Sequence, residues 1–406
     1  MTAASALGIV VSQFPRDDEA FILRDLTALD QGGRELVIFS LRPCRDRVIH
    51  EQAKPLRSRT VYAPFVWSWA VWRSHGYFLR RAPRAYLGSL WWMVSRHWAH
   101  PAILLRTLVL FPKTVHFARV AQVRGVRHLH ALWATYPAAS AIIMGRLTGA
   151  TYSMAAHAHD IYTTNPTLRE KMRRARFTVT CTESNKRYLQ QLSMNGETVV
   201  VNYHGVDLAR FAPLSKPRGP VCRIVSVGGL LPCKGFGTLI EACRLLTRRR
   251  IPVHCTIAGG GPLERSLRRQ IARDGLASCV ELTGSISQER VAALYQQAHL
   301  AVLPLVSKIH WGIPNVLIEA LATRTPVISC ALPSIIELVD HGRSGWIIPE
   351  QDPQALAAAI ERLWNDEPTR EAIAEAGYQR VVERFSLERT GERLRGLFSA
   401  NRALHA

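Results

Sequence analysis

The sequence predicts an α/β protein made of two doubly wound domains, each with a parallel sheet covered by helices. Short apolar runs alternate with segments of helical spacing along most of the chain, the pattern of repeated strand–helix–strand units. A Pro- and Gly-rich stretch at residues 212–220 interrupts the alternation and is typical of a domain boundary. With 406 residues, 48% of them hydrophobic, the chain can bury two hydrophobic cores.

The first domain, residues 1–212, is expected to open with a strand, a helix and a strand, and to resume the alternation after a long helical insert. Its strands are predicted at 7–12, 35–41, 126–133, 151–156 and 177–182, and its helices at 19–29 and 138–147. The second domain, residues 213–385, repeats the pattern. Its strands are predicted at 223–227, 254–258, 280–283, 300–304 and 326–329, with helices such as 237–248 and 262–274. Residues 386–402 have helical spacing and follow the second domain.

Composition argues against several classes of protein. The eight cysteines form no C-x-x-C pair and no His/Cys run with zinc spacing, so we expect reduced thiols, no disulfide frame and no metal site. No apolar run is long enough to span a bilayer, and the first residues lack the layout of a signal peptide. The sequence therefore predicts a cytoplasmic protein.

The net charge of +21 is concentrated in the first domain, where 28 basic and 13 acidic residues give a net charge of +15. The rest of the chain has 24 basic and 18 acidic residues, which give +6. From Gln52 to His159 the sequence has fourteen Lys and Arg and no Asp or Glu. Tryptophans and arginines interleave in this segment: Trp67, Trp69, Trp72, Arg73, Arg80, Arg81, Arg84, Trp91, Trp92, Arg96 and Trp98.

We interpret this basic, Trp-rich segment as a membrane-facing surface, because indole rings and basic side chains suit the lipid headgroup region. The alternative is that the tryptophans fill the core while the arginines form a solvated face. A nucleic-acid patch would use the same residue types, but no nucleic-acid motif accompanies them. We therefore expect no nucleic-acid partner.

The segment 312–322 carries the strongest functional signal. A Gly-x-Pro turn, formed by Gly312, Ile313 and Pro314, runs into a helix that starts at Asn315 and carries Glu319 one turn in. The free N–H groups and the positive dipole end of a helix start suit a phosphate, while Glu319 can reach a sugar hydroxyl. Together these features fit a sugar nucleotide.

This segment resembles the donor-site motif of the retaining glycosyltransferases of family 4, also called glycosyl transferases group 1, in which two Glu residues flank the turn. Glu319 matches the second Glu, while Trp311 stands where the first would be. The resemblance extends over three further blocks in the same order, at 225–236, 257–263 and 337–346. It implies the GT-B fold, in which two Rossmann-like domains face each other across a cleft, and a last helix, here 386–406, that crosses back to the first domain.

Glycine-rich loops are the next candidates for the donor site. Gly228 and Gly229 follow a predicted strand and precede Lys234, whose ammonium can neutralise a diphosphate. By resemblance, Lys234 takes the diphosphate-binding role, and Gly229 replaces an arginine of the family. The second loop, Gly259, Gly260 and Gly261, can let a nucleotide lie close to the backbone, and Ser285 is a candidate for contact with the base. Taken singly, such residues are usually tight turns or solvated charges.

In the first domain, His159 and Asp160 follow a predicted strand and so lie at the sheet edge where α/β proteins bind ligands. By resemblance, His159 matches the active-site histidine that contacts the transferred sugar, with Asp160 orienting the loop. Phe14 and Glu19 resemble the first loop of a colanic acid and exopolysaccharide branch of the family, which implies a place on the acceptor side. Glu19 also suits the first turn of a helix.

The resemblance implies a metal-independent retaining enzyme that moves a hexose from a GDP- or UDP-linked sugar to a lipid-linked saccharide in exopolysaccharide or lipopolysaccharide biosynthesis. Its only cofactor would be the nucleotide-sugar co-substrate, and it would act at the inner face of the cytoplasmic membrane. Lys234 and the N–H groups of residues 313–315 would stabilise the departing phosphate. The alternative is a degenerate member that binds nucleotide sugar or glycan without turnover, which the residues at Gly229 and Trp311 favour.

Overall fold

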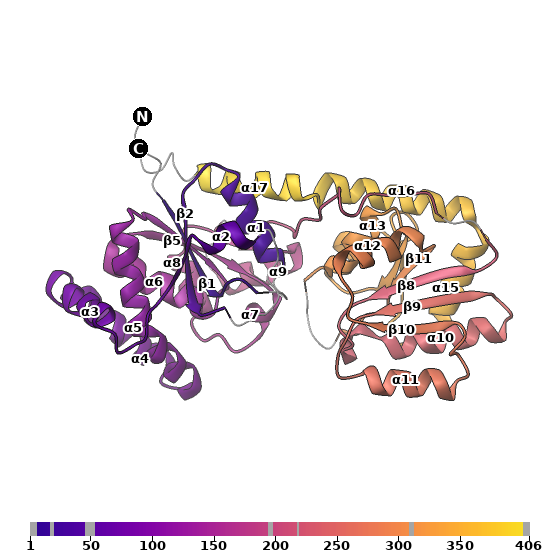
Figure 1. The fold of residues 1–406 in the computed structure, drawn as a ribbon, viewed down its shortest axis with the longest axis horizontal. Coiled ribbons are helices and arrows are strands. Elements are labelled where there is room, and N and C mark those ends of the chain that lie inside the picture. Colours follow the sequence, from indigo (N-terminus) through magenta and orange to yellow (C-terminus); the bar gives the residue numbers. More distant parts are fainter. Residues whose placement is uncertain are drawn as a thin grey trace. The chain divides into compact units, whose positions relative to one another are not determined.

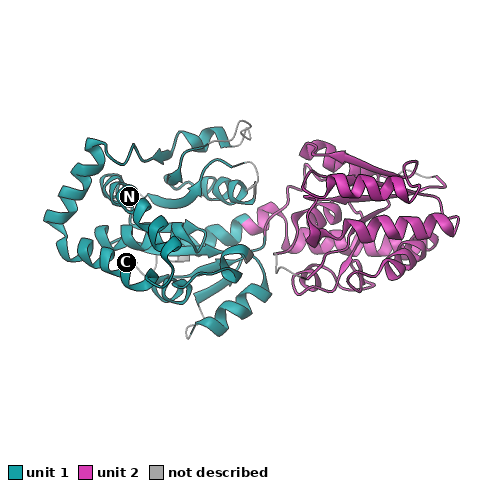
Figure 2. Cartoon of the chain, turned by 90° about the horizontal axis from the view of Figure 1, so that it is seen from below, with its two compact units in different colours: residues 1–203, 391–406 teal, residues 204–390 magenta. Residues whose placement is uncertain are grey.

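The computed structural model describes residues 6–16, 20–44, 53–193, 198–216, 219–307 and 312–400. The chain divides into two compact units (Figure 2). Unit 1 comprises Met1–Tyr203 with Gly391–Ala406, and unit 2 comprises His204–Thr390. The sequence placed the boundary after Ala212, whereas the division lies between Tyr203 and His204.

Unit 1 contains a seven-stranded parallel sheet in the order β3-β2-β1-β4-β5-β6-β7. Its strands are β1 (Leu7–Gln13), β2 (Leu36–Arg42), β3 (Thr60–Tyr62), β4 (His128–Leu132), β5 (Thr151–Ala156), β6 (Thr178–Thr180) and β7 (Val199–Val201). The central strands are nearly continuous runs of buried apolar residues, as expected for parallel strands covered on both faces.

Nine helices of unit 1 lie among the described residues. They are α1 (Ala20–Asp30), α2 (Lys54–Arg57), α3 (Trp69–Arg81), α4 (Pro83–His97), α5 (Pro101–Val123), α6 (Tyr136–Thr148), α7 (Ala158–Tyr162), α8 (Leu168–Arg174) and α9 (Glu183–Leu192). Helix α6 is almost wholly buried and packs on β1, β4 and β5. Helices α4 and α5 pack on α6, and α3 packs on α5, so α3, α4 and α5 gather at one edge of the unit (Figure 1).

Unit 2 repeats the architecture with a six-stranded parallel sheet in the order β10-β9-β8-β11-β12-β13. Its strands are β8 (Cys222–Val227), β9 (Val253–Ala258), β10 (Val280–Gly284), β11 (Leu300–Leu303), β12 (Val327–Cys330) and β13 (Trp346–Ile348). Its helices are the 3₁₀ turn η3 (Pro232–Lys234), α10 (Phe236–Arg248), α11 (Glu264–Arg273), α12 (Gln288–Gln297), α13 (Asn315–Ala322), α14 (Ile335–Leu338), α15 (Pro353–Asn365) and α16 (Glu367–Arg384). The two doubly wound domains predicted from the sequence are therefore present.

The last described helix, α17 (Leu387–Ala400), begins in unit 2, and its residues from Gly391 onward belong to unit 1. Leu394 and Phe398 are buried in the core of unit 1. The ring of Phe398 lies 5.1 Å from that of His130 and 5.4 Å from that of Phe177. This helix therefore completes the hydrophobic core of the first unit.

Candidate active site

The glycine loops predicted from the sequence to bind a donor lie at the carboxyl edge of the unit 2 sheet. In parallel α/β sheets, ligands bind where the strands end and the following helices begin. The loops after β8, β9, β10 and β11 all end at this edge, because these four strands are parallel neighbours. The predicted donor residues therefore come from four loops of one edge.

Backbone hydrogen bonds tie the first glycine loops together. The N–H of Gly228 donates to the carbonyl of Ala258 (2.9 Å), and that of Leu230 donates to the carbonyl of Gly260 (2.9 Å). Gly259 has a φ of 148° and passes so close to the carbonyl of Gly228 that an added Cβ would lie 2.0 Å from this oxygen. A side chain at Gly259 would therefore push the two loops apart, and only glycine fits.

Gly229 differs from its neighbours because it has room around it. The nearest atoms to a Cβ added there would be 3.9 Å away, and its backbone conformation is open to other residues. At Gly260, an added Cβ would lie 2.8 Å from the hydroxyl oxygen of Ser285, which places Ser285 beside the second glycine loop. The loops after β8, β9 and β10 thus meet around Gly260.

Lys234 ends the turn η3 and lies directly before Gly235. Its Cδ and Cε would both be 4.0 Å from a Cβ added to Gly228, so the alkyl chain runs along the first glycine loop. Burial lowers the pKa of Lys234 below its usual value. The N–H of Val306, just after β11, donates to the carbonyl of Cys233 (2.9 Å), which fixes the turn that carries this lysine to the next loop.

Helix α13 starts at the same edge, two residues after Ile313. Pro314 occupies the N-cap position and provides no side-chain cap for the first N–H groups of the helix. The side-chain oxygen of Asn315 is buried and has no hydrogen-bond partner within the described ranges. An uncapped helix start with a buried amide oxygen beside it can take a polar ligand.

Glu319 lies one turn into α13 and is 7% exposed. Its charge contributes to raising the pKa of Tyr295, although burial of that phenol is the larger cause. Gly312 and Ile313 precede the helix, while Trp311 lies outside the described residues.

The corresponding edge of unit 1 is built mainly from side chains. His157 follows β5 and is buried, whereas His159, two residues later in α7, is exposed. The ring of His157 lies 5.1 Å from those of Phe21 and Trp133, each in an edge-on arrangement. Trp133, at the end of β4, has a φ of 143°, a conformation that is rare for a non-glycine residue and common at ligand sites.

Asp160 is fully buried and holds two loops together. Its carboxylate accepts hydrogen bonds from the N–H of His157 (2.7 Å) and from the N–H of Ala134. Burial raises the pKa of Asp160 to about 7, although both hydrogen bonds and the charge of Lys171 oppose the shift. Asp160 thus ties the loop after β5 to the loop after β4 and has no exposed surface.

Lys171 of α8 completes this network. Its ammonium donates to the carbonyls of Ala134 (2.9 Å) and Thr135 (3.0 Å) and to the side chain of Asn165 (3.1 Å). Burial lowers the pKa of Lys171 to about 7, and the charge of Asp160 opposes this shift. The sequence analysis did not select Lys171, because nothing in its neighbourhood, Arg169 to Arg174, distinguishes it from the exposed basic residues around it.

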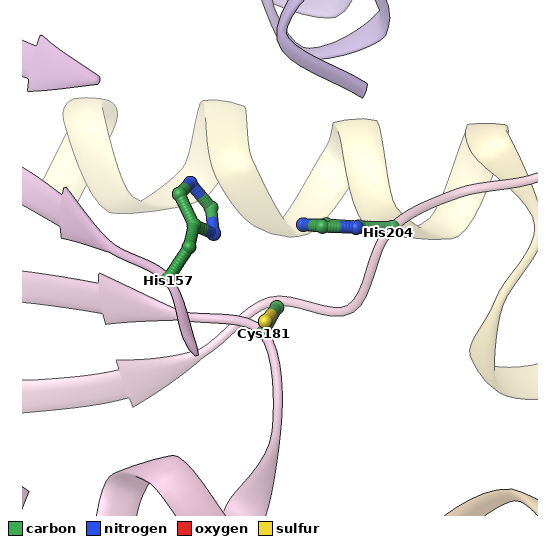
Figure 3. A group of neighbouring side chains, drawn as sticks. All are labelled: His157, Cys181 and His204. Atoms are coloured by element: carbon green, nitrogen blue, oxygen red, sulfur yellow. The ribbon is translucent and has the colours of Figure 1, made fainter. Parts of the chain in front are cut away.

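Three potential metal ligands lie close to this edge (Figure 3). His157 follows β5, Cys181 follows β6, and His204, the first residue of unit 2, directly follows Tyr203 after β7. Their ligand atoms all lie within 4.8 Å of one another. The sequence showed no zinc-like spacing, since these residues come from three segments that the parallel strand order brings together.

Phe14, predicted on the acceptor side, is buried at the end of β1. Its N–H donates to the hydroxyl of Ser40 (3.0 Å), and its carbonyl accepts from the hydroxyl of Tyr62 (2.9 Å). These contacts fix the loop after β1 against β2 and β3. Glu19 lies outside the described residues.

Comparison with known proteins agrees with this geometry. Residues 222–366 match the family described as glycosyl transferases group 1. The WcaL protein of Salmonella typhimurium, named for colanic acid biosynthesis, is 34% identical over 214 residues, which cover 52% of this chain and 53% of that protein. The amylovoran biosynthesis glycosyltransferase AmsK of Erwinia amylovora is 38% identical over 167 residues, which cover 40% of this chain and 41% of that protein. The chain thus spans about half the length of these curated relatives.

The fold is also that of a solved glycosyltransferase-like structure. The HepE protein of Anabaena, solved in complex with UDP, superposes with a TM-score of 0.72 at 15% identity, over 98% of this chain and all of that one. At this identity the likeness establishes the fold alone, and it confirms the GT-B class predicted from the sequence. Residues 222–366 thus match the glycosyl transferases group 1 family, and the chain is similar over about half its length to relatives named for exopolysaccharide biosynthesis.

Proposed function

We propose that the protein is a retaining glycosyltransferase that moves a hexose from a GDP- or UDP-linked sugar to a lipid-linked saccharide during exopolysaccharide or lipopolysaccharide assembly. The observation that carries the proposal is the carboxyl edge of the unit 2 sheet. There, the backbone of two glycine loops, the side chain of Lys234 and the uncapped start of α13 surround the ends of neighbouring strands. The UDP complex of the Anabaena protein and the polysaccharide-synthesis relatives support this reading.

The donor diphosphate would be held mainly by backbone groups and one ammonium. Lys234 loses part of its hydration on burial, which lowers its pKa, and the charge of an incoming anion would stabilise the ammonium and raise that pKa again. N–H groups at the start of α13 would bind the same phosphates. Gly228, Gly259 and Gly261 would let the diphosphate approach the backbone, while Ser285 would contact the base and Glu319 the ribose.

Catalysis would depend on charge that develops on the leaving phosphate. Fixed donors aimed at such a charge typically contribute 10²- to 10³-fold each. In this mechanism the acceptor hydroxyl attacks from the face of the departing phosphate, which takes the hydroxyl proton, so the protein needs no carboxylate nucleophile. The nucleotide sugar would be the co-substrate, and we propose that the enzyme needs no metal.

A histidine of unit 1 would contact the transferred sugar. The resemblance assigned this role to His159, which lies exposed on α7, while His157 lies buried at the end of β5 against Phe21 and Trp133. His157→Ala and His159→Ala variants distinguish the two. The variant of the sugar-contacting histidine should lower kcat by about 10²-fold, the lower end of the effect of a positioned acid–base group.

The first test is thermal stabilisation by GDP- and UDP-sugars, followed by acceptor-dependent release of nucleoside diphosphate. Binding at 100 times the dissociation constant should add about 2.7 kcal/mol to the free energy of unfolding. Lys234→Ala should lower turnover by about 10²-fold or more and leave the fold intact. Glu319→Gln should also lower turnover. Lys186→Ala, which removes an ammonium from the surface helix α9, is the matched control. Unchanged turnover in Lys234→Ala would refute this donor site.

A second candidate is a binding protein without turnover. It is favoured by Gly229, which stands where the family has an arginine and has open space around it. If the protein is stabilised by a nucleotide sugar but releases no nucleoside diphosphate, this reading is correct. Gly229→Arg then tests whether the missing guanidinium explains the loss.

Turnover that persists in EDTA would support the metal-independent enzyme.

A further inference from the structure

The outer faces of α3, α4 and α5 carry apolar side chains where a surface helix normally carries polar ones. In α4, buried residues point inward at Tyr86, Ser89, Met93 and His97. The opposite face exposes Leu87 (58%), Trp91 (72%), Val94 (41%) and Trp98 (74%). These four are spaced by four, three and four residues, so they form one continuous outward stripe.

Helix α3 and the turn before it repeat this arrangement. Val71, Ser74, His75 and Phe78 are buried, while Trp67, Trp69 and Trp72 are 70%, 75% and 50% exposed. The rings of Trp67 and Trp72 lie 5.9 Å apart, which makes a small exposed aromatic cluster. Of the six tryptophans between residues 67 and 98, only Trp92 is buried in the core.

The first half of α5 adds a third outward stripe of aliphatic residues. Leu105, Leu108 and Val109 are 64%, 36% and 58% exposed, on the face opposite the buried Thr107 and Phe111. Because α3 and α4 both pack on α5, the three stripes belong to one helical layer (Figure 1). We call this layer's exposed side the α3–α5 face.

Basic side chains surround the apolar stripes. Trp69, Trp72, Arg73, Arg80, Arg81 and Arg119 line a hollow of about 800 Å³ at α3 and α5. The guanidinium of Arg119 lies 3.9 Å from the centre of the Tyr77 ring, so it is held in place at the wall. Residues 52–159 supply no carboxylate to neutralise these arginines. The hollow therefore suits an anion bordered by apolar groups.

We propose that the α3–α5 face docks on a bilayer that contains anionic phospholipid, with a lipid phosphate in the arginine-lined hollow. Indole rings and basic residues favour the headgroup region, while Leu87, Val94, Leu105 and Val109 would reach the acyl boundary. These aliphatic side chains do not stack on bases, which disfavours single-stranded nucleic acid as the partner. Within the described ranges, no helix has the length and apolarity to cross a bilayer, so docking would be peripheral.

This inference rests on the proposed function for its purpose, since a lipid-linked acceptor would be met at a membrane surface. Vesicle binding can nevertheless be measured without donor or acceptor. A failure of docking would therefore leave the donor-site tests unaffected, and a failure of turnover would leave docking standing.

The experiment is flotation of the full chain with vesicles of phosphatidylcholine alone and of phosphatidylcholine mixed with phosphatidylglycerol, at low and high salt. Two double variants probe the two components of the face. Arg73→Glu with Arg80→Glu reverses charge at the hollow, and Leu87→Ser with Leu105→Ser removes apolar surface. Each should weaken binding to the mixed vesicles by about tenfold or more.

Matched controls come from unit 2. Arg265→Glu with Arg269→Glu makes the same charge change on the exposed side of α11. Leu214→Ser with Ile336→Ser removes aliphatic residues that are 59% and 55% exposed, close to the 58% and 64% of Leu87 and Leu105. These controls should bind vesicles like the wild type, and melting curves should show that all variants fold.

Binding that needs phosphatidylglycerol, weakens with salt and is lost only in the α3–α5 variants would support the proposal. The proposal is overturned if the wild type binds neither kind of vesicle, or if the control variants lose as much binding as the α3–α5 variants. It is equally overturned if duplex DNA displaces the vesicles from the protein, since the face would then be a nucleic-acid surface.

Discussion

The carboxyl edges of the two sheets are built in different ways. In unit 2, the edge consists largely of backbone: glycine loops bonded to each other through N–H and carbonyl groups, and a helix start without a side-chain cap. In unit 1, it consists of side chains, with His157 and Asp160 at the start of α7 and Lys171 on α8. In the proposed function, the unit 2 edge would recognise its ligand by shape and backbone dipoles, and the unit 1 edge by titratable groups.

This difference determines which amino-acid substitutions each edge tolerates. A backbone-built edge depends on the few positions where two chains pass too closely for a side chain. A side-chain-built edge depends on buried charges that must stay paired. Four predictions test this contrast.

The largest effect is expected for Gly259→Ala. Its Cβ would lie 2.0 Å from the Gly228 carbonyl oxygen, and its φ of 148° is strained for alanine, so the two loops must separate. Nucleotide binding should weaken by about 100-fold or more, as measured by titration calorimetry. Gly229→Ala, where the nearest atom is 3.9 Å away, should bind normally. Equal binding by both variants would contradict a backbone-built donor edge.

Next in size is Lys171→Met in unit 1. It leaves Asp160 buried without its cation, which should lower the free energy of unfolding by about 3 kcal/mol in denaturant titrations. Arg173→Met, an exposed neighbour on the same helix, should cost less than about 0.5 kcal/mol. Combining Asp160→Asn with Lys171→Met should cost less than the sum of the two changes. Additive losses would show that the two residues do not act as a pair.

A smaller effect is expected from acidification. Burial lowers the pKa of His130 in unit 1 to about 3, from 6.5 when unfolded. Since the folded pKa is the lower one, the stabilising contribution is complete above pH 6.5 and is lost as the pH falls toward 3. Between pH 6.5 and 5 the loss should reach about 2 kcal/mol. His130→Gln should flatten this part of the pH dependence, and an unchanged slope would exclude His130 as its source.

The smallest effect is expected for Ser285→Ala. If the donor edge relies on backbone, removing this hydroxyl should weaken nucleotide binding by only about two- to fivefold, the net contribution of one hydrogen bond. Titration of GDP and UDP separately would also show whether the hydroxyl distinguishes the bases. A loss as large as that of Gly259→Ala would mean that side chains matter as much here as in unit 1.

The difference between the two sheet edges also explains which parts of the molecule could be predicted from the sequence. The loops of the proposed donor edge could be selected from the sequence because each is a continuous run, such as Gly259–Gly261 or Gly312–Asn315, and a local pattern suffices to describe it. The two parallel sheets were also predicted, since their central strands are apolar runs of ordinary length. Strands β3, β7 and β13 were missed, because each has only three residues and shows no readable periodicity, whereas the equally short β6 lies inside the predicted strand 177–182.

Less of the unit 1 edge could be predicted from the sequence, for a physical reason. Cys181 and His204 are distant in sequence from His157, and the parallel strand order brings the three together. The resemblance selected His159, whereas burial separates His157 from His159 and the pattern His-Ala-His does not. Tertiary packing supplies that distinction.

The entry of α17 into unit 1 has a consequence for biosynthesis. Phe398 covers His130 and Phe177, yet the ribosome must make all of His204–Thr390 before it reaches this residue. At 5–20 residues per second, that interval is on the order of ten seconds or longer. During it, the nascent first unit exposes the apolar surface that α17 will later cover, so it would be a target for chaperones until synthesis nears completion.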